Sequence, residues 1–327
     1  LFHRPRRRHY RSRCYCGIEG QNWLMLAPTA TLDTSKDQPF RLLSDAEQAA
    51  EAMPDLLLKA RTVARTIMSG WHGRRMAGPG EAFWQFRPFV EGENAHTIDW
   101  RRSARDDTVF IREREWEAAQ TAWLWLDLTK SMQFGSTLSG VTKRARSIVL
   151  TLAMAELLAA GGERTGLLGH TRATTTRNAA EKFASRIARA GVLDTSEGMP
   201  HPDGVNRFAE VILFGDFLDP IAELESFLHE IARKGTRGHV VQVLDPIEES
   251  FPFQGRVEFT DPETGMKVTA SRAQSYRDEY RDRLETRRQA VKELCARLDW
   301  TFLIHHTDRP ASEAVLTLYN RMAGGRI

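Results

Sequence analysis

The pattern of apolar and polar positions first predicts a helix and a small β element. Apolar residues recur at helical spacing over residues 53–67, after a capping-box pattern at 44–47 and before a stop at Gly70. Aromatic residues in 83–89 and the apolar run 108–112 are typical of β-strands. We therefore expect an N-terminal helix followed by a short antiparallel pair.

From residue 121 onward, short apolar runs alternate with amphipathic segments. The expected strands are 123–127, 165–170, 211–215, 239–244 and 301–305. The expected helices are 143–160, 181–190, 276–298 and 312–322. A further helix is expected to begin with Asp219 as its N-cap and Pro220 as its first residue. A hairpin is expected within 256–269. This alternation predicts an α/β fold with a doubly wound, mostly parallel sheet.

The N-terminal segment, residues 1–43, is treated as a separate basic arm. Six arginines lie within residues 1–13 without an acidic residue. Three interpretations stay open for it: a disordered arm, an upstream extension foreign to the native protein, or a nucleic-acid-binding arm. The six arginines exceed the net charge of +3, so the remainder of the chain is slightly acidic. Nucleic-acid binding is therefore disfavoured for the folded part.

Apolar runs and cysteines limit the expected location of the protein. The longest apolar runs span about eight residues, far below the roughly 20 that a transmembrane helix needs. The three cysteines, Cys14, Cys16 and Cys295, are too few for a disulfide framework and suit a reducing compartment. We therefore expect a cytoplasmic protein without a membrane span, with Cys295 in the core.

Acidic residues follow several of the expected strands. Asp127, Asp216 and Asp245 each come at a strand end, where doubly wound sheets bind their ligands. In an extended loop, Asp127, Thr129 and Ser131 point the same way, and such hard oxygen ligands suit Mg²⁺. The alternative is that these residues only cap the helix that follows.

Two stretches resemble known families. Asp127-Leu-Thr129-Lys-Ser131 resembles the metal-ion-dependent adhesion site of von Willebrand factor type A domains, whose usual form is Asp-x-Ser-x-Ser. Residues 86–93 and 98–105 resemble the signature of the domain-of-unknown-function-58 family, which couples such a segment to a type A-like domain. The resemblance covers roughly residues 50–327 and implies two units, 44–120 with the helix and signature, and 121–327 with the type A-like domain.

The resemblance also implies a ligand set for Mg²⁺. Asp127, Thr129 and Ser131 would form the first metal loop, and Asp216 would supply the second carboxylate from a neighbouring strand. Type A domains add a threonine from an intervening loop, for which residues 191–207 offer Thr195 or Ser196 without a clear match. A further departure is Glu93, which stands where the family signature commonly has Asp.

The signature contains a candidate docking surface for a protein partner, formed by Arg87, Asp99, Trp100, Arg101 and Arg105. The alternative is purely structural: Asp99 orients an arginine through an ion pair, and Trp100 packs against the main domain. Proteins of the resembled family commonly accompany MoxR-type AAA+ ATPases, which makes such an ATPase the expected partner.

The expected function is a non-enzymatic protein-interaction or assembly module. In it, Mg²⁺ at the strand ends would accept an acidic side chain of the partner. One alternative is a metal-dependent hydrolase that uses the same carboxylates, with His306 or Asp308 approaching as the base. The other is nucleic-acid binding through the arginine-rich arm.

Overall fold

The computed structural model describes residues 27–28, 41–69, 83–90, 98–105, 108–114, 120–192, 199–218, 220–262 and 265–324. Within these residues the chain is a mixed α/β protein built on a five-stranded sheet, with strand order β10-β7-β6-β4-β5. All four pairings in this sheet are parallel. Its strands are β4 (Thr121–Leu126), β5 (Arg164–Leu167), β6 (Glu210–Gly215), β7 (Arg237–Leu244) and β10 (Thr301–His306).

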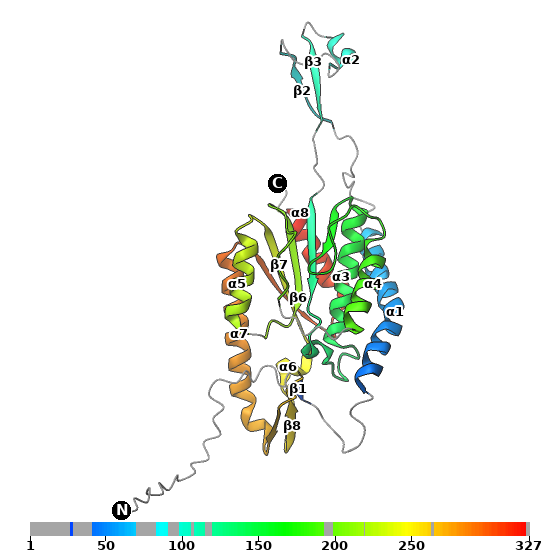
Figure 1. Ribbon diagram of the computed structural model, residues 1–327. Coiled ribbons are helices and arrows are strands. Elements are labelled where there is room, and N and C mark those ends of the chain that lie inside the picture. Colours follow the sequence, from blue (N-terminus) through cyan, green and yellow to red (C-terminus); the bar gives the residue numbers. More distant parts are fainter. Residues whose placement is uncertain are drawn as a thin grey trace, which may run out of the picture.

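Helices cover both faces of this sheet, as Figure 1 shows. The helices are α1 (Arg41–Ser69), α3 (Lys143–Ala160), α4 (Ala179–Val192), α5 (Ile221–Ala232), α6 (Pro246–Ser250), α7 (Arg277–Arg297) and α8 (Ala311–Gly324). Residues of α1, α3, α4 and α8 share one core cluster, whereas residues of α5 and α7 belong to a second. The sheet therefore has a four-helix side and a two-helix side, and the prediction of a doubly wound fold is confirmed.

Strand β4 shows how the sequence divides the two cores. Its side chains alternate, because successive residues of a strand point to opposite faces of the sheet. Leu124 and Leu126 join the core on the four-helix side, whereas Trp123 and Trp125 join the core under α5 and α7. All six residues of the strand are buried. A continuous apolar run of this kind is what a central strand covered on both faces requires.

Two small antiparallel elements accompany the main sheet. The expected pair is present as β2 (Phe83–Pro88) and β3 (Phe110–Arg114), with the short helix α2 (Trp100–Ser103) between them in the chain. The expected hairpin is β8 (Val257–Thr260) with β9 (Lys267–Ala270). The two-residue strand β1 (Ala27–Pro28), which the sequence did not predict, pairs with β8.

Helix starts differ from expectation at two places. α1 begins at Arg41, so Ser44 lies inside the helix and is not its N-cap. α5 begins at Ile221 with Pro220 in the N-cap position, one residue later than expected, and Asp219 is outside the described residues. Sequence patterns locate helix ends only to within a few residues, because the flanking backbone also decides where the helix begins.

The strand order places the ends of β4 and β6 side by side. β5 lies on one side of β4, and β6, β7 and β10 follow on the other, so the chain reverses direction across the sheet between β4 and β6. Ligands of open α/β sheets bind at such a reversal, beyond the carboxyl ends of the strands. Asp127 follows β4 and Asp216 follows β6 at this point, where both segments of the chain leave the sheet.

Candidate functional site

The candidate site lies where β4 and β6 end. The backbone N–H of Asp127 donates to the carbonyl of Phe214 at 2.8 Å, which carries the parallel pairing one residue beyond β4. A Cβ atom on Gly215 would lie 3.2 Å from the Asp127 Cβ atom, so glycine leaves room for the aspartate. Backbone pairing and this close approach therefore fix the Asp127 side chain beside the loop that carries Asp216.

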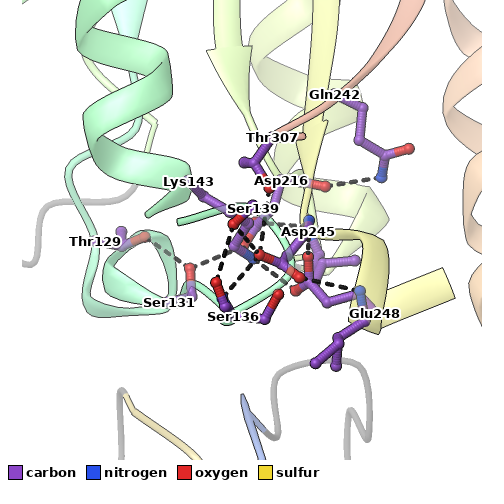
Figure 2. Close-up of polar contacts among 12 residues, drawn as sticks. Thr129, Ser131, Ser136, Ser139, Lys143, Asp216, Gln242, Asp245, Glu248 and Thr307 are labelled. Carbon is purple, nitrogen blue, oxygen red and sulfur yellow. Dashed lines mark hydrogen bonds and ion pairs between the residues drawn. The ribbon is translucent and has the colours of Figure 1, made fainter. Parts of the chain in front are cut away.

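Hydroxyl groups join the two aspartates. The Thr129 hydroxyl donates to Asp127 Oδ1 at 2.6 Å, and the Thr129 backbone N–H donates to the same oxygen at 2.8 Å. The Ser131 hydroxyl donates to Asp216 Oδ2 at 2.9 Å. The two hydroxyl oxygens lie 3.1 Å apart (Figure 2). The four residues expected at the site are thus brought into one contiguous group.

A lysine that the sequence did not assign completes this group. Lys143, the first residue of α3, places Nζ 2.9 Å from Asp216 Oδ2 and 2.8 Å from Glu248 Oε1. The Lys143 residue is only 1% exposed, and Asp216 only 2%. The ammonium therefore bridges two carboxylates, one from the loop after β6 and one from α6.

A second network, centred on Asp245, holds the loop that follows Ser131. Asp245 Oδ2 accepts from the Ser136 backbone N–H and the Ser139 hydroxyl, both at 2.9 Å, and from the Thr307 hydroxyl at 3.2 Å. Asp245 also caps α6 reciprocally with Glu248, which accepts from the Asp245 backbone N–H at 2.7 Å. The two networks therefore meet at Glu248.

Charge interactions shift the pKa values of the central groups. Burial by itself would lower the pKa of Lys143, but the charges of Asp216 and Glu248 raise it well above its usual value. Burial would raise the pKa of Asp216, but the ion pair with Lys143 and the Ser131 hydroxyl hold it below its usual value. For Glu248, burial prevails over Lys143, and its pKa is raised. Lys143 and Asp216 consequently form a charged pair.

The backbone after β6 adopts an unusual conformation next to the site. Phe217, which is buried, has a positive φ of 52°, a region that bulky residues rarely adopt. The Leu218 backbone N–H donates to Asp216 Oδ1 at 3.2 Å, and Arg287 of α7 donates to the Phe217 carbonyl at 3.0 Å. Gln242 of β7 donates to the Asp216 carbonyl at 2.9 Å. These bonds fix the direction of the Asp216 side chain.

The described side chains do not fit a resident Mg²⁺ while Lys143 keeps this position. Asp216 Oδ2 already accepts from both Lys143 and Ser131, and a divalent ion on that carboxylate would lie beside a buried ammonium. No group of three His, Cys, Asp or Glu that could hold a metal ion occurs among the residues that the structure describes. Thr195 and Ser196, the candidates for the additional ligand, lie outside them.

The expected docking residues lie around α2. Asp99 caps this helix by accepting from the Arg102 backbone N–H at 2.9 Å, so its structural role is a helix cap. Trp100 is 66% exposed, which contradicts the alternative that it packs against the main domain. Arg101 and Arg105 are also exposed. Arg87 lies in β2, and its side chain is outside the described residues.

The residues considered as hydrolytic bases have other surroundings. His306 lies 2.9 Å from Glu249, with which it forms an ion pair when protonated. Asp308 is exposed beyond β10. His305, which precedes His306 in β10, is buried. Burial together with the charge of Arg146 lowers the pKa of His305 to about 4. His306 is therefore bound to Glu249 of α6, and Asp308 faces solvent.

Sequence reasoning missed Lys143 and Glu248. Glu248 could have been found, because Asp245-Pro-Ile-Glu248 has the spacing of a capping box, in which the first and fourth residues bind each other's backbone. Lys143 gives no comparable signal. A lysine beside an expected helix start is ordinary in a surface loop, and only the fold shows that its ammonium is buried.

A second concave surface lies at the β5 edge of the sheet. It is an open pocket of about 870 Å³ between the loop after β5, α4 and the segment around Pro200. Four of its lining residues are basic: Arg172, Lys182, Arg186 and Arg189. This pocket is built from elements other than the loops that carry Asp127 and Asp216.

None of the described helices is long and apolar enough to cross a bilayer. Comparison with known proteins finds relatives in two Mycobacterium species. Uncharacterized proteins of Mycobacterium bovis and Mycobacterium tuberculosis are each 26% identical over 252 residues, which cover 72% of this chain and 78% of theirs.

Two solved structures are also similar. One is a conserved hypothetical protein BatB from Bacteroides thetaiotaomicron, with 14% identity and a TM-score of 0.39 over 63% of this chain and 100% of that one. The other is an aerotolerance-related membrane protein from Bacteroides fragilis, with 14% identity and a TM-score of 0.33 over 62% and 100%. The family model described as "protein of unknown function DUF58" matches residues 85–290. Because this match covers more than half of the chain, the protein belongs to the DUF58 family.

Proposed function

We propose that this protein is a non-enzymatic interaction module with a von Willebrand type A-like domain, which binds a protein partner at the strand-end site. The observation that carries the proposal is the convergence of Asp127, Thr129, Ser131 and Asp216 at the reversal point between β4 and β6. Thr129 and Ser131 are half-buried above carboxylates that are almost fully buried. Partly exposed hydroxyls on a rigid base suit recognition of a polar group on another protein.

The charge states at the site favour binding over catalysis. Lys143, with its raised pKa, stays protonated and cannot accept a proton at neutral pH. Asp216, with its lowered pKa, stays ionised and already accepts from two donors. A hydrolase would need a base whose pKa lies near the working pH. For that reason the metal-dependent hydrolase is the less well supported function.

A second contact surface is proposed at α2. Trp100, in the segment of the chain between β2 and β3, exposes a large aromatic ring, and Arg101 and Arg105 of the same segment are also exposed. Tryptophan and arginine are the residues most enriched in the energetically dominant parts of protein interfaces. An exposed indole beside guanidinium groups therefore suits docking of a protein partner. Nucleic-acid binding through residues 1–43 has no support from the described residues.

The proposed partner is a MoxR-type AAA+ ATPase, and the proposed location is the cytoplasm. The partner class follows from the family resemblance, and the location follows from the cysteine usage and from the location of such ATPases. The proposed role is assembly or remodelling of client proteins, in which the ATPase supplies the energy and this chain supplies recognition.

Binding of the purified full chain to a purified MoxR-type ATPase from the same organism tests the proposal. We expect complex formation that weakens at least tenfold in Trp100→Ser and in Ser131→Ala. Leu58→Ser is the matched control, because Leu58 is 61% exposed on α1, away from both surfaces. Equal affinity of all four proteins would refute both proposed contact surfaces, and absence of a complex with wild type would refute the partner class.

A further inference from the structure

Lys143 is buried where a positive charge is unfavourable. It is the first residue of α3, and the free backbone N–H groups at a helix start carry partial positive charge. A buried ammonium at such a position is tolerated only with anionic partners. Asp216 and Glu248 are those partners, at 2.9 and 2.8 Å.

The ammonium binds the same carboxylate oxygen as the last hydroxyl of the Asp-x-Thr-x-Ser loop. Lys143 Nζ and Ser131 Oγ both donate to Asp216 Oδ2, each at 2.9 Å. Ser131 in turn lies beside Thr129, which binds Asp127. Figure 2 shows Lys143 extending from α3 into this group. A positive charge is thus already present on the carboxylate that the family resemblance assigns to Mg²⁺.

The other partner of the ammonium is also held in place. Glu248 Oε1 binds Lys143, while Glu248 Oε2 accepts from the Asp245 backbone N–H at 2.7 Å. Asp245 is fully buried and bound by Ser136 and Ser139. Moving the ammonium away from Asp216 would leave two buried carboxylates without their counter-ion.

We propose that the Lys143 ammonium is the resident cation of the strand-end site and takes the place of a divalent metal ion. In wild-type protein the site does not bind Mg²⁺, and its shape does not depend on a metal. Only one consequence rests on the proposed function: a partner bound at this site is held by the partly exposed hydroxyl groups, without a metal bridge.

Isothermal titration calorimetry and thermal unfolding of the purified full chain, with Mg²⁺ and with Mn²⁺ as probes, test the proposal. Wild type is expected to show no saturable binding and no shift in Tm. Lys143→Met removes the ammonium at nearly constant length and leaves Asp216 with Glu248 to attract a cation. This variant is expected to bind Mg²⁺ with a rise in Tm of about 5 °C at 100-fold excess over Kd.

Lys130→Met is the matched control, because it removes an ammonium from the short helical turn Lys130–Gln133 and leaves the Lys143 ammonium on Asp216; it is expected to behave as wild type. If Lys143→Met does not fold, Lys143→Met with Glu248→Gln keeps Asp216 for the metal and removes one excess charge. Saturable binding by wild type that is lost in Asp127→Asn overturns the proposal. So does the absence of binding in a folded protein that lacks Lys143.

These titrations use the protein alone, so their outcome does not depend on the partner. Failure of the ATPase to bind would refute the proposed partner class and leave the inference intact. Conversely, saturable Mg²⁺ binding by wild type that is lost in Asp127→Asn would refute the inference and leave the interaction function intact.

Discussion

Asp245 and Glu248 bind each other's backbone at the start of α6. The Asp245 carboxylate accepts from the Ile247 backbone N–H at 3.0 Å, and the Glu248 carboxylate accepts from the Asp245 backbone N–H at 2.7 Å. The same two side chains bind the loop after Ser131 and the Lys143 ammonium. A local helix cap therefore also fixes the strand-end site.

Asp245→Ala is expected to destabilise the protein. The substitution removes the cap and leaves the half-buried donors of Ser136 and Ser139 and the buried Thr307 hydroxyl without this acceptor, which together costs about 3 kcal/mol. Urea unfolding followed by circular dichroism measures this loss. The matched control is Asp99→Ala, which removes the cap of the peripheral helix α2 and is expected to change the free energy of global unfolding by less than about 1 kcal/mol. Equal losses in the free energy of unfolding for the two variants would contradict the conclusion that Asp245 does more than cap a helix.

Gly238→Ala is expected to disturb the packing between β7 and the segment before β10. A Cβ atom at Gly238 would lie 1.9 Å from ring atoms of Trp300, a contact that requires the indole or the strand to move. Overpacking of this kind costs about 1–3 kcal/mol. Thermal unfolding should show a lower Tm.

Gly161→Ala is the control for that substitution. Its Cβ atom would meet its nearest neighbour at 3.4 Å, and Gly161 has a φ of −74°, so we expect little change. Combining Gly238→Ala with Trp300→Leu should recover part of the lost stability. A Gly238→Ala protein with unchanged Tm would contradict the prediction, because it would show that the Trp300 indole can move without loss of stability.

His305 is expected to make the protein less stable in mild acid. Burial and the charge of Arg146 lower its folded-state pKa to about 4, whereas an unfolded histidine has a pKa of about 6.5. As the pH falls below the unfolded value, the unfolded state takes up a proton that the folded state refuses. Stability contributed by His305 is therefore fully present above about pH 6.5 and is lost as the pH falls toward 4.

Between about pH 7 and pH 5, His305 alone should lower the free energy of unfolding by about 2 kcal/mol. Urea unfolding at both pH values should show a smaller difference for His305→Gln than for wild type. His201→Gln is the control, because His201 is exposed. The same pH dependence in wild type and His305→Gln would contradict the prediction.

Cys295 is expected to be unreactive in the folded protein. It lies in the core under α7, and burial raises the pKa of its thiol to about 12. Since the thiolate is the reactive form, a thiol reagent near pH 8 should modify Cys295 only after unfolding. The measurement requires Cys14→Ser and Cys16→Ser, so that Cys295 is the remaining thiol. Rapid modification without denaturant would indicate local opening of α7.

The sheet was predictable because the strand signal is local. Runs such as Val211–Phe214 are apolar on both faces, as strands covered by helices on both sides must be, and the helices between them show a clear apolar stripe. The order of the strands does not follow from these local runs, because the rule that parallel crossovers are right-handed restricts the possible orders without selecting one. β1 was not predictable, because two residues carry no periodicity and pair only with a hairpin far along the chain.

The candidate site was predictable in part. Asp127 and Asp216 follow strands, and strand ends of neighbouring parallel strands meet at one edge of the sheet. The Mg²⁺ predicted there stays untested, and the positions for a fifth ligand lie outside the described residues. The exposure of Trp100 was not predictable from sequence, because it depends on what surrounds α2 in space and not on the residues next to it in the chain.

By itself, the sequence determined the alternation of strands and helices and the carboxylates and hydroxyls at the strand ends. Only the tertiary structure decided which positively charged side chain lies beside these groups. Lys143 is 73 positions from Asp216 and 105 from Glu248, so no local pattern links the three. Folding brings them together out of water, where an ammonium must have anionic partners, and this requirement makes Lys143 part of the site.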